Sequence, residues 1–294
     1  MQESSRVGRE LRILVVCTHT GLLESTGSTR RLEFYLEALS PPNRVTLLVP
    51  SSLKRTRNRF FTRYKTHFFR YFKFGQRSLW FTSDANPFFL TKLYKTVREE
   101  GSDVVQIHML WGVVSGSLLS RRRVVYVAHS VESDLVKIVV SRFPFLIGRL
   151  AYYYSYVFEF LACKFARHIT CTSDVDRARF IQKYQADPSK LSTMPIGIHV
   201  EEDDGNLGSV KNIKCKHGRD EPKVVAFLGS YFHLPNKTAI RLITDYIAPR
   251  VWELDRKIVF LIAGNGVPEF VARNVRSLGF VKDVREFLKS VDLA

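Results

Sequence analysis

A histidine stands where open α/β sheets place their ligands. Residues 124–128 form an apolar run that predicts a strand, and His129 follows at its carboxyl end. Ligands of open α/β sheets bind beyond the carboxyl ends of the strands, so His129 is a candidate for holding a polar substrate. The alternative is a structural histidine satisfied by hydrogen bonds. Glu132, three residues on, could orient a substrate hydroxyl or cap a helix, and we favour the cap.

A glycine-containing loop near the amino end could bind phosphate. It follows a predicted strand and leads into a helix predicted over residues 29–39, with Gly27 and Ser28 at the helix start. Backbone N–H groups point outward at such a start and favour anions. Gly21 and Gly27 are too far apart for a dinucleotide fingerprint. A plain strand-to-helix turn with Ser28 or Thr29 as the N-cap explains these residues equally well.

A second loop of this kind lies within residues 224–237, which read VVAFLGSYFHLPNK. An apolar run ends in a glycine and Ser230, and a helix is predicted to start near Asn236. Lys237, His233 and the amino end of that helix could offset the charge of a phosphate group. The alternative is that Asn236 is only the N-cap of a helix that packs its apolar face. The two interpretations are compatible.

Apolar runs alternate with helical patterns along nearly the whole chain, which predicts parallel α/β layers. Ser173 and Asp176 have the spacing of a capping box, which predicts a helix start. The glycine turns at 264–266 and 279–281 each follow a predicted strand, and the second turn ends at Val281. The strands are expected at residues 11–17, 45–49, 104–107, 124–128, 168–172, 224–228, 258–263, 277–280 and 291–294.

A break in this pattern predicts two domains. Pro195, Gly197 and the acidic stretch 201–221 interrupt the alternation. We therefore expect a Rossmann-like domain over 1–198, a linker over 199–222 and a second Rossmann-like domain over 223–294. A complete unit of this kind needs about 150 residues, so we expect the second domain to be incomplete and its open sheet to need cover from a partner or from the first domain.

The formal net charge of +17 indicates that the protein has a polyanionic neighbour. Residues 54–77 carry nine Lys/Arg and eight aromatic residues without an acid. On a helical wheel the aromatic residues form one stripe beside the arginines, which predicts an amphipathic helix at an anionic membrane surface. The alternatives are a helix packed on its own domain and a nucleic-acid site, which no compact binding motif supports. The expected contacts are Arg59, Phe60, Arg63, Tyr64, Phe68 and Arg70.

Other features exclude some classes of protein. The four cysteines lie far apart without a CxxC pair, which favours reduced thiols over a disulfide framework or a zinc site. No signal peptide is evident, and no stretch reaches the roughly 20 apolar residues of a membrane span. Residues 139–163 come closest and indicate a buried, partly interfacial helix. We expect a cytoplasmic protein, peripheral on the inner face of a membrane.

The order of these segments resembles the GT-B glycosyltransferases, specifically the large retaining family 4. Residues 166–198, with their capping box and Pro-x-Gly-Ile ending, are similar to the family's run into the interdomain crossover. The resemblance implies a GT-B fold of two Rossmann-like domains. It also implies transfer of a sugar from a nucleotide diphosphate to an acceptor hydroxyl with retention of configuration. The leaving phosphate itself would accept the proton, and neither a metal nor a further cofactor is expected.

The resemblance also implies roles for single residues. His129 would face the transferred sugar, although Ser130 stands where the family has asparagine. Gly27 and Ser28 match the loop that closes over the diphosphate. Ser230 replaces a common arginine, and Lys237 matches the family's lysine with one residue inserted. Asn236 fits a subset of the family with a Gly-Ser…Pro-Asn sequence, and Val281 would lie beside the base.

The family's later glutamate pair has no counterpart in this sequence. We therefore expect a C-terminally incomplete chain, in which the activity is uncertain. The alternative function is that of a non-catalytic GT-B relative that binds a membrane or a protein partner. The basic aromatic segment favours a lipid-linked or membrane-proximal acceptor, and the sequence does not choose among UDP, GDP and ADP sugars.

Overall fold

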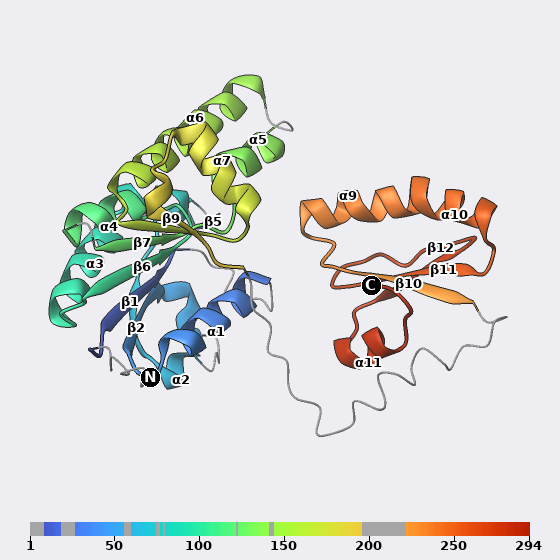
Figure 1. Ribbon diagram of the computed structural model, residues 1–294, viewed down its shortest axis with the longest axis horizontal. Helices are drawn as coiled ribbons and strands as arrows, with labels where there is room; N and C mark the ends of the chain where they lie inside the picture. Colours follow the sequence, from blue (N-terminus) through green and yellow to red (C-terminus); the bar gives the residue numbers. More distant parts are fainter. Residues whose placement is uncertain are drawn as a thin grey trace, which may run out of the picture. The chain divides into compact units, whose positions relative to one another are not determined.

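The protein consists of two α/β units, which are described separately. The computed structural model describes residues 9–18, 27–55, 60–74, 77–78, 80–121, 123–140, 144–195 and 222–294. Contacts divide the chain into Met1–His199 and Val200–Ala294 (Figure 1). Strands and helices alternate in both, which confirms the predicted α/β class. The domain limits drawn from the sequence stay a prediction, because residues 196–221 lie outside the described part.

The first unit is built on a seven-stranded sheet in the order β3-β2-β1-β6-β7-β8-β9. Every pair of neighbouring strands is parallel. The five strands predicted in this half of the chain are β1, β2, β6, β7 and β8, whereas β3 and β9 were not expected. The strands are β1 (Arg12–Cys17), β2 (Arg44–Pro50), β3 (Lys65–Phe69), β6 (Val104–His108), β7 (Val124–Val127), β8 (His168–Cys171) and β9 (Leu191–Thr193), with a separate antiparallel pair β4 (Lys73–Phe74) and β5 (Arg77–Ser78).

Helices cover both faces of this sheet, because the side chains of its inner strand β1 alternate between two cores. Leu14 and Val16 pack with Phe89 of α3, while Ile13 and Val15 belong to the core formed with α1. The helices are α1 (Gly27–Leu39), α2 (Phe60–Arg63), α3 (Pro87–Glu99), α4 (Val113–Leu119), α5 (Glu132–Val140), α6 (Phe145–Phe165) and α7 (Asp174–Tyr184), with 3₁₀ turns η2 (Ser51–Arg55), η3 (Trp80–Ala85) and η4 (Pro188–Lys190).

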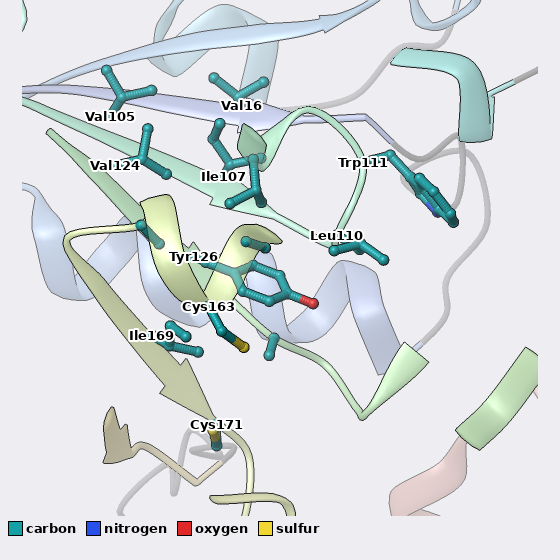
Figure 2. Close-up of a cluster of buried hydrophobic side chains, with 14 of the residues drawn as sticks. Val16, Val105, Ile107, Leu110, Trp111, Val124, Tyr126, Cys163, Ile169 and Cys171 are labelled. Carbon is teal, nitrogen blue, oxygen red and sulfur yellow. The ribbon is translucent and has the colours of Figure 1, made fainter. Parts of the chain in front are cut away.

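The larger core lies between the sheet and helices α3, α4, α6 and α7. Tyr126 of β7 lies in it, fully buried beside Ile107 of β6 and Ile169 of β8 (Figure 2). Cys163 and Cys171 contribute their side chains to the same core. This core fixes the carboxyl ends of β6, β7 and β8 relative to one another.

The prediction of one amphipathic helix over residues 54–77 is wrong. In its place η2, the four-residue α2 and the edge strand β3 follow one another, and β3 pairs with β2 in parallel. The ring of Tyr64 is buried and its hydroxyl donates to the carbonyl oxygen of Leu36, so it is not a surface aromatic residue. Phe68 is half-buried on the α1 side of the sheet. Of the described aromatic residues of the expected stripe, Tyr64 is therefore core and Phe68 is partly core, whereas Phe72 is exposed by 39%.

Only some of the contacts expected in this segment have described side chains. Arg63 and Arg70 are exposed, and Arg63 lies 3.7 Å from the carboxylate of Glu37. Arg59 and the side chain of Phe60 lie outside the described residues. Lipid contact through Arg63 and Arg70 stays a prediction, but no continuous amphipathic helix carries it.

The apolar stretch 139–163 is also not one helix. Helix α5 ends at Val140 and α6 begins at Phe145, so the stretch spans a helix end, a connection and most of α6. In the part of the chain that the structure describes, no helix combines the length and the apolar character that crossing a bilayer requires.

The second unit is a four-stranded sheet in the order β10-β11-β13-β12. β10, β11 and β13 are parallel, and the short β12 pairs antiparallel with β13. Near its end the chain returns to β10 through a parallel bridge between Val225 and Leu293. The elements are β10 (Lys223–Leu228), α9 (Leu234–Leu242), the π-helical turn η5 (Ile243–Ile247), α10 (Ala248–Leu254), β11 (Ile258–Ala263), β12 (Val271–Ala272), β13 (Val275–Gly279) and α11 (Val284–Lys289).

Candidate functional site

The carboxyl edge of the first sheet carries the candidate residues of the first unit. Because β1, β6, β7 and β8 are parallel, their carboxyl ends lie along one edge. Thr18, His108, His129 and Thr172 stand at the ends of these four strands. The hydroxyl of Thr18 donates to the carbonyl oxygen of Trp111 at 2.8 Å, which ties the end of β1 to the segment after β6.

His129 lies within a row of aromatic rings at this edge. Its ring meets that of His108 edge-on at 5.7 Å between centroids, and the His108 ring meets Tyr35 of α1 at 5.3 Å. His129 is half-buried, whereas His108 is buried. The structure therefore places His129 at the predicted edge of the sheet beside a buried ring, and contact of His129 with a substrate stays a prediction. His108 was not predicted as a site residue, although His108 directly follows a predicted strand as His129 does.

The segment after β8 supports the His129 loop from the other side. Thr172 Oγ1 donates to the carboxylate of Asp176 at 2.7 Å and lies 3.3 Å from the carbonyl oxygen of His129. Ser173 caps α7 by accepting the backbone N–H of Asp176 at 3.1 Å. The predicted helix start with Ser173 as its N-cap is confirmed, while the carboxylate of Asp176 accepts the hydroxyl of Ser173 at 2.8 Å and not its backbone N–H.

A buried carboxylate on α6 caps the helix that follows His129. Glu159 accepts the backbone N–H of Glu132 at 2.7 Å and that of Ser133 at 3.0 Å. It also accepts the hydroxyl of Tyr184 at 2.6 Å. Burial raises the pKa of Glu159, although these three hydrogen bonds favour its charged form. Two of the N–H groups at the start of α5 are thereby satisfied from a different helix.

The expectation that Glu132 caps a helix is wrong. Glu132 is the first residue of α5, and Glu159 supplies the cap that was ascribed to it. Its own side chain is buried, and burial together with the nearby charge of Glu159 raises its pKa to about 7. The sequence signal was present in part: Glu159 interrupts an apolar run. An acid in such a position is buried with partners or not tolerated.

Gly27 and Ser28 lie in the first turn of α1, at the same edge of the sheet as His129. Because Ser28 is inside the helix as described, its interpretation as the N-cap is wrong. The side chain of Ser28 and the loop at residues 19–26 lie outside the described residues, so contact of Gly27 and Ser28 with a phosphate stays a prediction.

In the second unit, three turns converge at the carboxyl edge of the sheet. Backbone hydrogen bonds run from Gly229 N to Ala263 O at 2.9 Å, and from Gly264 N to Gly279 O at 2.7 Å. A third runs from Tyr231 N to Asn265 O at 2.9 Å. The turns after β10, β11 and β13 are thereby bonded to one another. Together they form a surface of backbone groups at the edge where ligands of such sheets bind.

Gly264 makes this convergence possible. Its φ is +149°, and a Cβ atom there would lie 2.0 Å from the carbonyl oxygen of Gly229. No other residue fits so close to a neighbouring backbone. The glycine is therefore required by the approach of two turns, which the sequence pattern alone did not show.

Ser230, Asn236 and Lys237 lie around the first of these turns. Asn236 is not the N-cap of α9, because the helix begins at Leu234 after His233. Its amide instead donates to the carbonyl oxygen of Ser230 at 2.9 Å and closes the loop. Lys237 places its ammonium group 4.8 Å above the ring of Tyr231. A cation and the amino end of a helix thus face one backbone turn.

Val281 follows the third turn, and its side chain packs into a small core with Ala226, Ala263 and Phe287. A contact of this residue with a ligand would therefore come from its backbone. Its neighbour Phe280 is exposed.

Comparison with known proteins adds a family and a fold. The profile of Glycosyltransferase Family 4 matches residues 26–202. No curated protein sequence matches the chain. HepE of Anabaena in complex with UDP and glucose is 15% identical, has a TM-score of 0.58, and aligns over 96% of this chain and 73% of its own.

Two further solved structures agree with this comparison. The sucrose-phosphate synthase of Thermosynechococcus elongatus is 13% identical with a TM-score of 0.62, over 92% of this chain and 71% of its own. A glycosyltransferase of Rickettsia africae is 12% identical with a TM-score of 0.56, over 97% and 72%. At these identities the likeness concerns the fold.

Proposed function

The chain belongs to Glycosyltransferase Family 4, whose profile matches more than half of it, and from this premise we propose that it transfers a sugar from a nucleotide diphosphate sugar to an acceptor hydroxyl. It has the GT-B fold of its structural neighbours. Family and fold support a nucleotide sugar as the substrate class. The observation that carries the proposal is His129 at the carboxyl edge of the first sheet, half-buried against His108.

The second unit would bind the donor. We assign the diphosphate to the turn that Ser230 opens, because Lys237 and the amino end of α9 offer positive charge there. We assign the base to the turn that ends at Val281, whose backbone borders the same edge. The bonded turns at Gly229 and Gly264 hold these two places at a fixed separation.

The first unit would hold the sugar. His129 can donate a hydrogen bond to a sugar hydroxyl or accept one from it, and Glu159 keeps the segment after His129 in place through α5. Gly27 and Ser28, in the first turn of α1, are assigned to the diphosphate side of the donor.

The proposed reaction retains the configuration of the sugar. The bond between the anomeric carbon and the phosphate oxygen breaks, and a bond from that carbon to the acceptor oxygen forms on the same face. The proton of the acceptor hydroxyl moves to the leaving phosphate oxygen. This step needs positioning and charge stabilisation from the protein and no protein nucleophile.

A UDP sugar is the first donor to test, because HepE was solved with UDP and glucose. A lipid-linked or membrane-proximal acceptor is the class that we propose. The net charge of +17 and the exposed Arg63 and Arg70 suit an acceptor at an anionic surface.

Equilibrium binding of UDP, GDP and ADP by calorimetry tests the proposal. We expect one of the three nucleotides to bind with one-to-one stoichiometry and the corresponding nucleotide sugar to compete with it. Absence of binding for all three nucleotides would contradict a donor site in the second unit.

A further inference from the structure

Helix α6 is apolar on both sides: Tyr154, Tyr156, Phe158 and Phe160 pack against the core of the unit, and a second set of apolar side chains is exposed. The fully covered positions are Gly148, Ser155, Glu159, Ala162 and Cys163. A helix on the surface of a protein ordinarily buries its large apolar side chains and shows polar ones to water. Packing within the unit therefore does not account for the exposed apolar side chains of α6.

The outward face carries four apolar side chains at spacings of four, three and four residues, which places them in one line. We call Leu146, Leu150, Tyr153 and Val157 the α6 stripe. Their exposed fractions are 68%, 62%, 52% and 48%. At 1.5 Å per residue the stripe is about 17 Å long. Figure 1 shows α6 as the long helix next to α5 and α7.

The first turn of α6 extends this apolar surface. Phe145 and Ile147 are exposed by 76% and 56%, and on α5 the side chain of Ile138 is exposed by 62%. Contiguous exposed apolar surface of this kind is rare on soluble proteins and marks a docking surface.

The charges around the α6 stripe are positive. Arg149 lies over the rings of Phe145 and Tyr153, at 5.1 and 5.9 Å from their centroids. The guanidinium group is thus held beside the apolar side chains, close enough to meet a lipid headgroup when they enter the interface. Lys137 of α5 and Lys164 of α6 are also exposed.

The described acids of α5 and α6 do not oppose this charge. Glu132 and Glu159 are buried. Asp134 is paired with Arg179 at 2.7 Å and with Lys183 at 2.7 Å. These ion pairs lower the pKa of Asp134 to about 2, so it stays paired at neutral pH. The surface next to the α6 stripe thus complements an anionic partner.

We propose that the α6 stripe docks on an anionic lipid surface, with the helix lying in the plane of the interface. Apolar and tyrosine side chains would enter the boundary between headgroups and acyl chains, and Arg149 would meet the headgroups. A lipid surface fits because the stripe is a convex helix face that combines apolar, aromatic and basic side chains. The surface differs from the one expected at residues 54–77, where Tyr64 is core and Phe68 is partly core.

This inference concerns lipid binding and stands apart from sugar transfer. It adds to the proposed function because Glu159, on the buried face of the same helix, caps the helix that follows His129. A lipid-bound α6 would hold the His129 segment at a fixed position relative to the membrane, where a lipid-linked acceptor presents its hydroxyl.

Vesicle flotation of the purified chain tests the proposal without any assay of activity. We would use phosphatidylcholine vesicles with and without phosphatidylglycerol, at about 0.05 M and about 0.5 M salt. We expect the protein to float with the anionic vesicles, and less at the higher salt. The variant L146Q/L150Q should bind at least about tenfold less, because two side chains no longer enter the apolar layer. Arg149→Gln should bind about fivefold less.

The matched control is L242Q/L254Q, which replaces two exposed leucines of the second unit by the same residues. It should bind within about twofold of the wild type, and circular dichroism should show that all variants are folded. R63Q/R70Q tests the surface near residues 54–77, and its loss of binding should be smaller than that of L146Q/L150Q.

Three results would overturn the proposal. The first is no flotation of the wild type with anionic vesicles at low salt. The second is flotation that L146Q/L150Q leaves unchanged, in particular when R63Q/R70Q removes it. The third is a dimer that forms without lipid and that L146Q/L150Q dissociates, since the α6 stripe would then belong to an interface between two copies of the chain.

Discussion

The carboxylate of Glu159 accepts the backbone N–H of Glu132 at 2.7 Å, across 27 residues of sequence. This contact joins α6 to the start of α5, and α5 begins three residues after His129. With the contacts from Ser133 and Tyr184, one carboxylate links α5, α6 and α7. The position of the candidate sugar-binding histidine therefore depends on a buried acid that does not itself contact the edge of the sheet.

Replacing Glu159 by glutamine should destabilise the first unit. The Glu159 carboxylate now accepts three hydrogen bonds. In the glutamine variant the NH₂ group would replace one of the two accepting oxygens, so at least one of these donors would lose its acceptor. We expect the free energy of unfolding in urea to fall by about 2 to 3 kcal/mol. Glu253→Gln is the control, because Glu253 is exposed and pairs only with Arg250 among the contacts described. A loss no larger than that of the control would contradict the role of Glu159 as a cap.

Replacing Glu132 by glutamine should change the pH dependence of stability. Burial raises the folded-state pKa of Glu132 from 4.5 to about 7. The Glu132 carboxyl group therefore binds its proton more tightly in the folded protein than in the unfolded chain. The resulting stabilisation is fully present below pH 4.5 and is lost as the pH rises to about 7. Glutamine carries no such dependence.

The free energy of unfolding of Glu132→Gln, relative to the wild type, should therefore rise between pH 5 and pH 8 by about 2 to 3 kcal/mol. Urea unfolding at several pH values measures this difference. The titratable groups that interact electrostatically with Glu132 are Glu159 of α6 and Tyr126 of β7. A difference that stays constant over this range would show that Glu132 titrates normally.

Alanine at position 264 should disrupt the second unit far more than alanine at position 279. Both glycines have positive φ, but a Cβ at Gly264 would meet the carbonyl oxygen of Gly229 at 2.0 Å, whereas a Cβ at Gly279 has no neighbour within 4 Å. We expect Gly279→Ala to cost about 1 to 2 kcal/mol from backbone strain, and Gly264→Ala to cost several kcal/mol. Equal losses in thermal unfolding would refute the close approach of the two turns.

Lys237→Gln should weaken binding of a nucleoside diphosphate and spare binding of the nucleoside. Lys237 follows the turn that we assign to the diphosphate, and its ammonium group is held over Tyr231. We expect about tenfold weaker diphosphate binding, equivalent to about 1.4 kcal/mol, with little change for the nucleoside. Lys289→Gln, on α11, is the control with the same change of charge. Equal weakening by both variants would indicate a general effect of net charge.

The elements with strong local signals could be predicted from the sequence. Apolar runs such as 104–107 and 124–128 are strands, and Ser173 is the N-cap of the helix predicted after it. His129 stands at the edge where it was expected, because the rule for carboxyl ends of strands needs only the strand and its direction. The same rule would have found His108.

Features that depend on distant residues could not be predicted in this way. Residues 65–69 join the sheet because β2 pairs with them, and that pairing overrides an aromatic spacing that suits a helix. Capping of α5 by Glu159 and the contact of Gly264 with Gly229 are likewise set by packing. The exposed apolar face of α6 becomes visible only when burial assigns the faces of the helix.

Turnover of nucleotide sugars is the decisive measurement for the proposed sugar transfer. Phosphorus NMR would follow release of the nucleoside diphosphate from UDP-, GDP- and ADP-glucose, and proton NMR would give the configuration of the freshly released sugar. We expect release from one donor with retention, and a rate about a hundredfold lower for His129→Asn. His168→Asn is the matched control, because His168 begins β8 at the opposite edge of the sheet and contacts Ser192. No release from any donor, or equal rates for the two variants, would contradict the account.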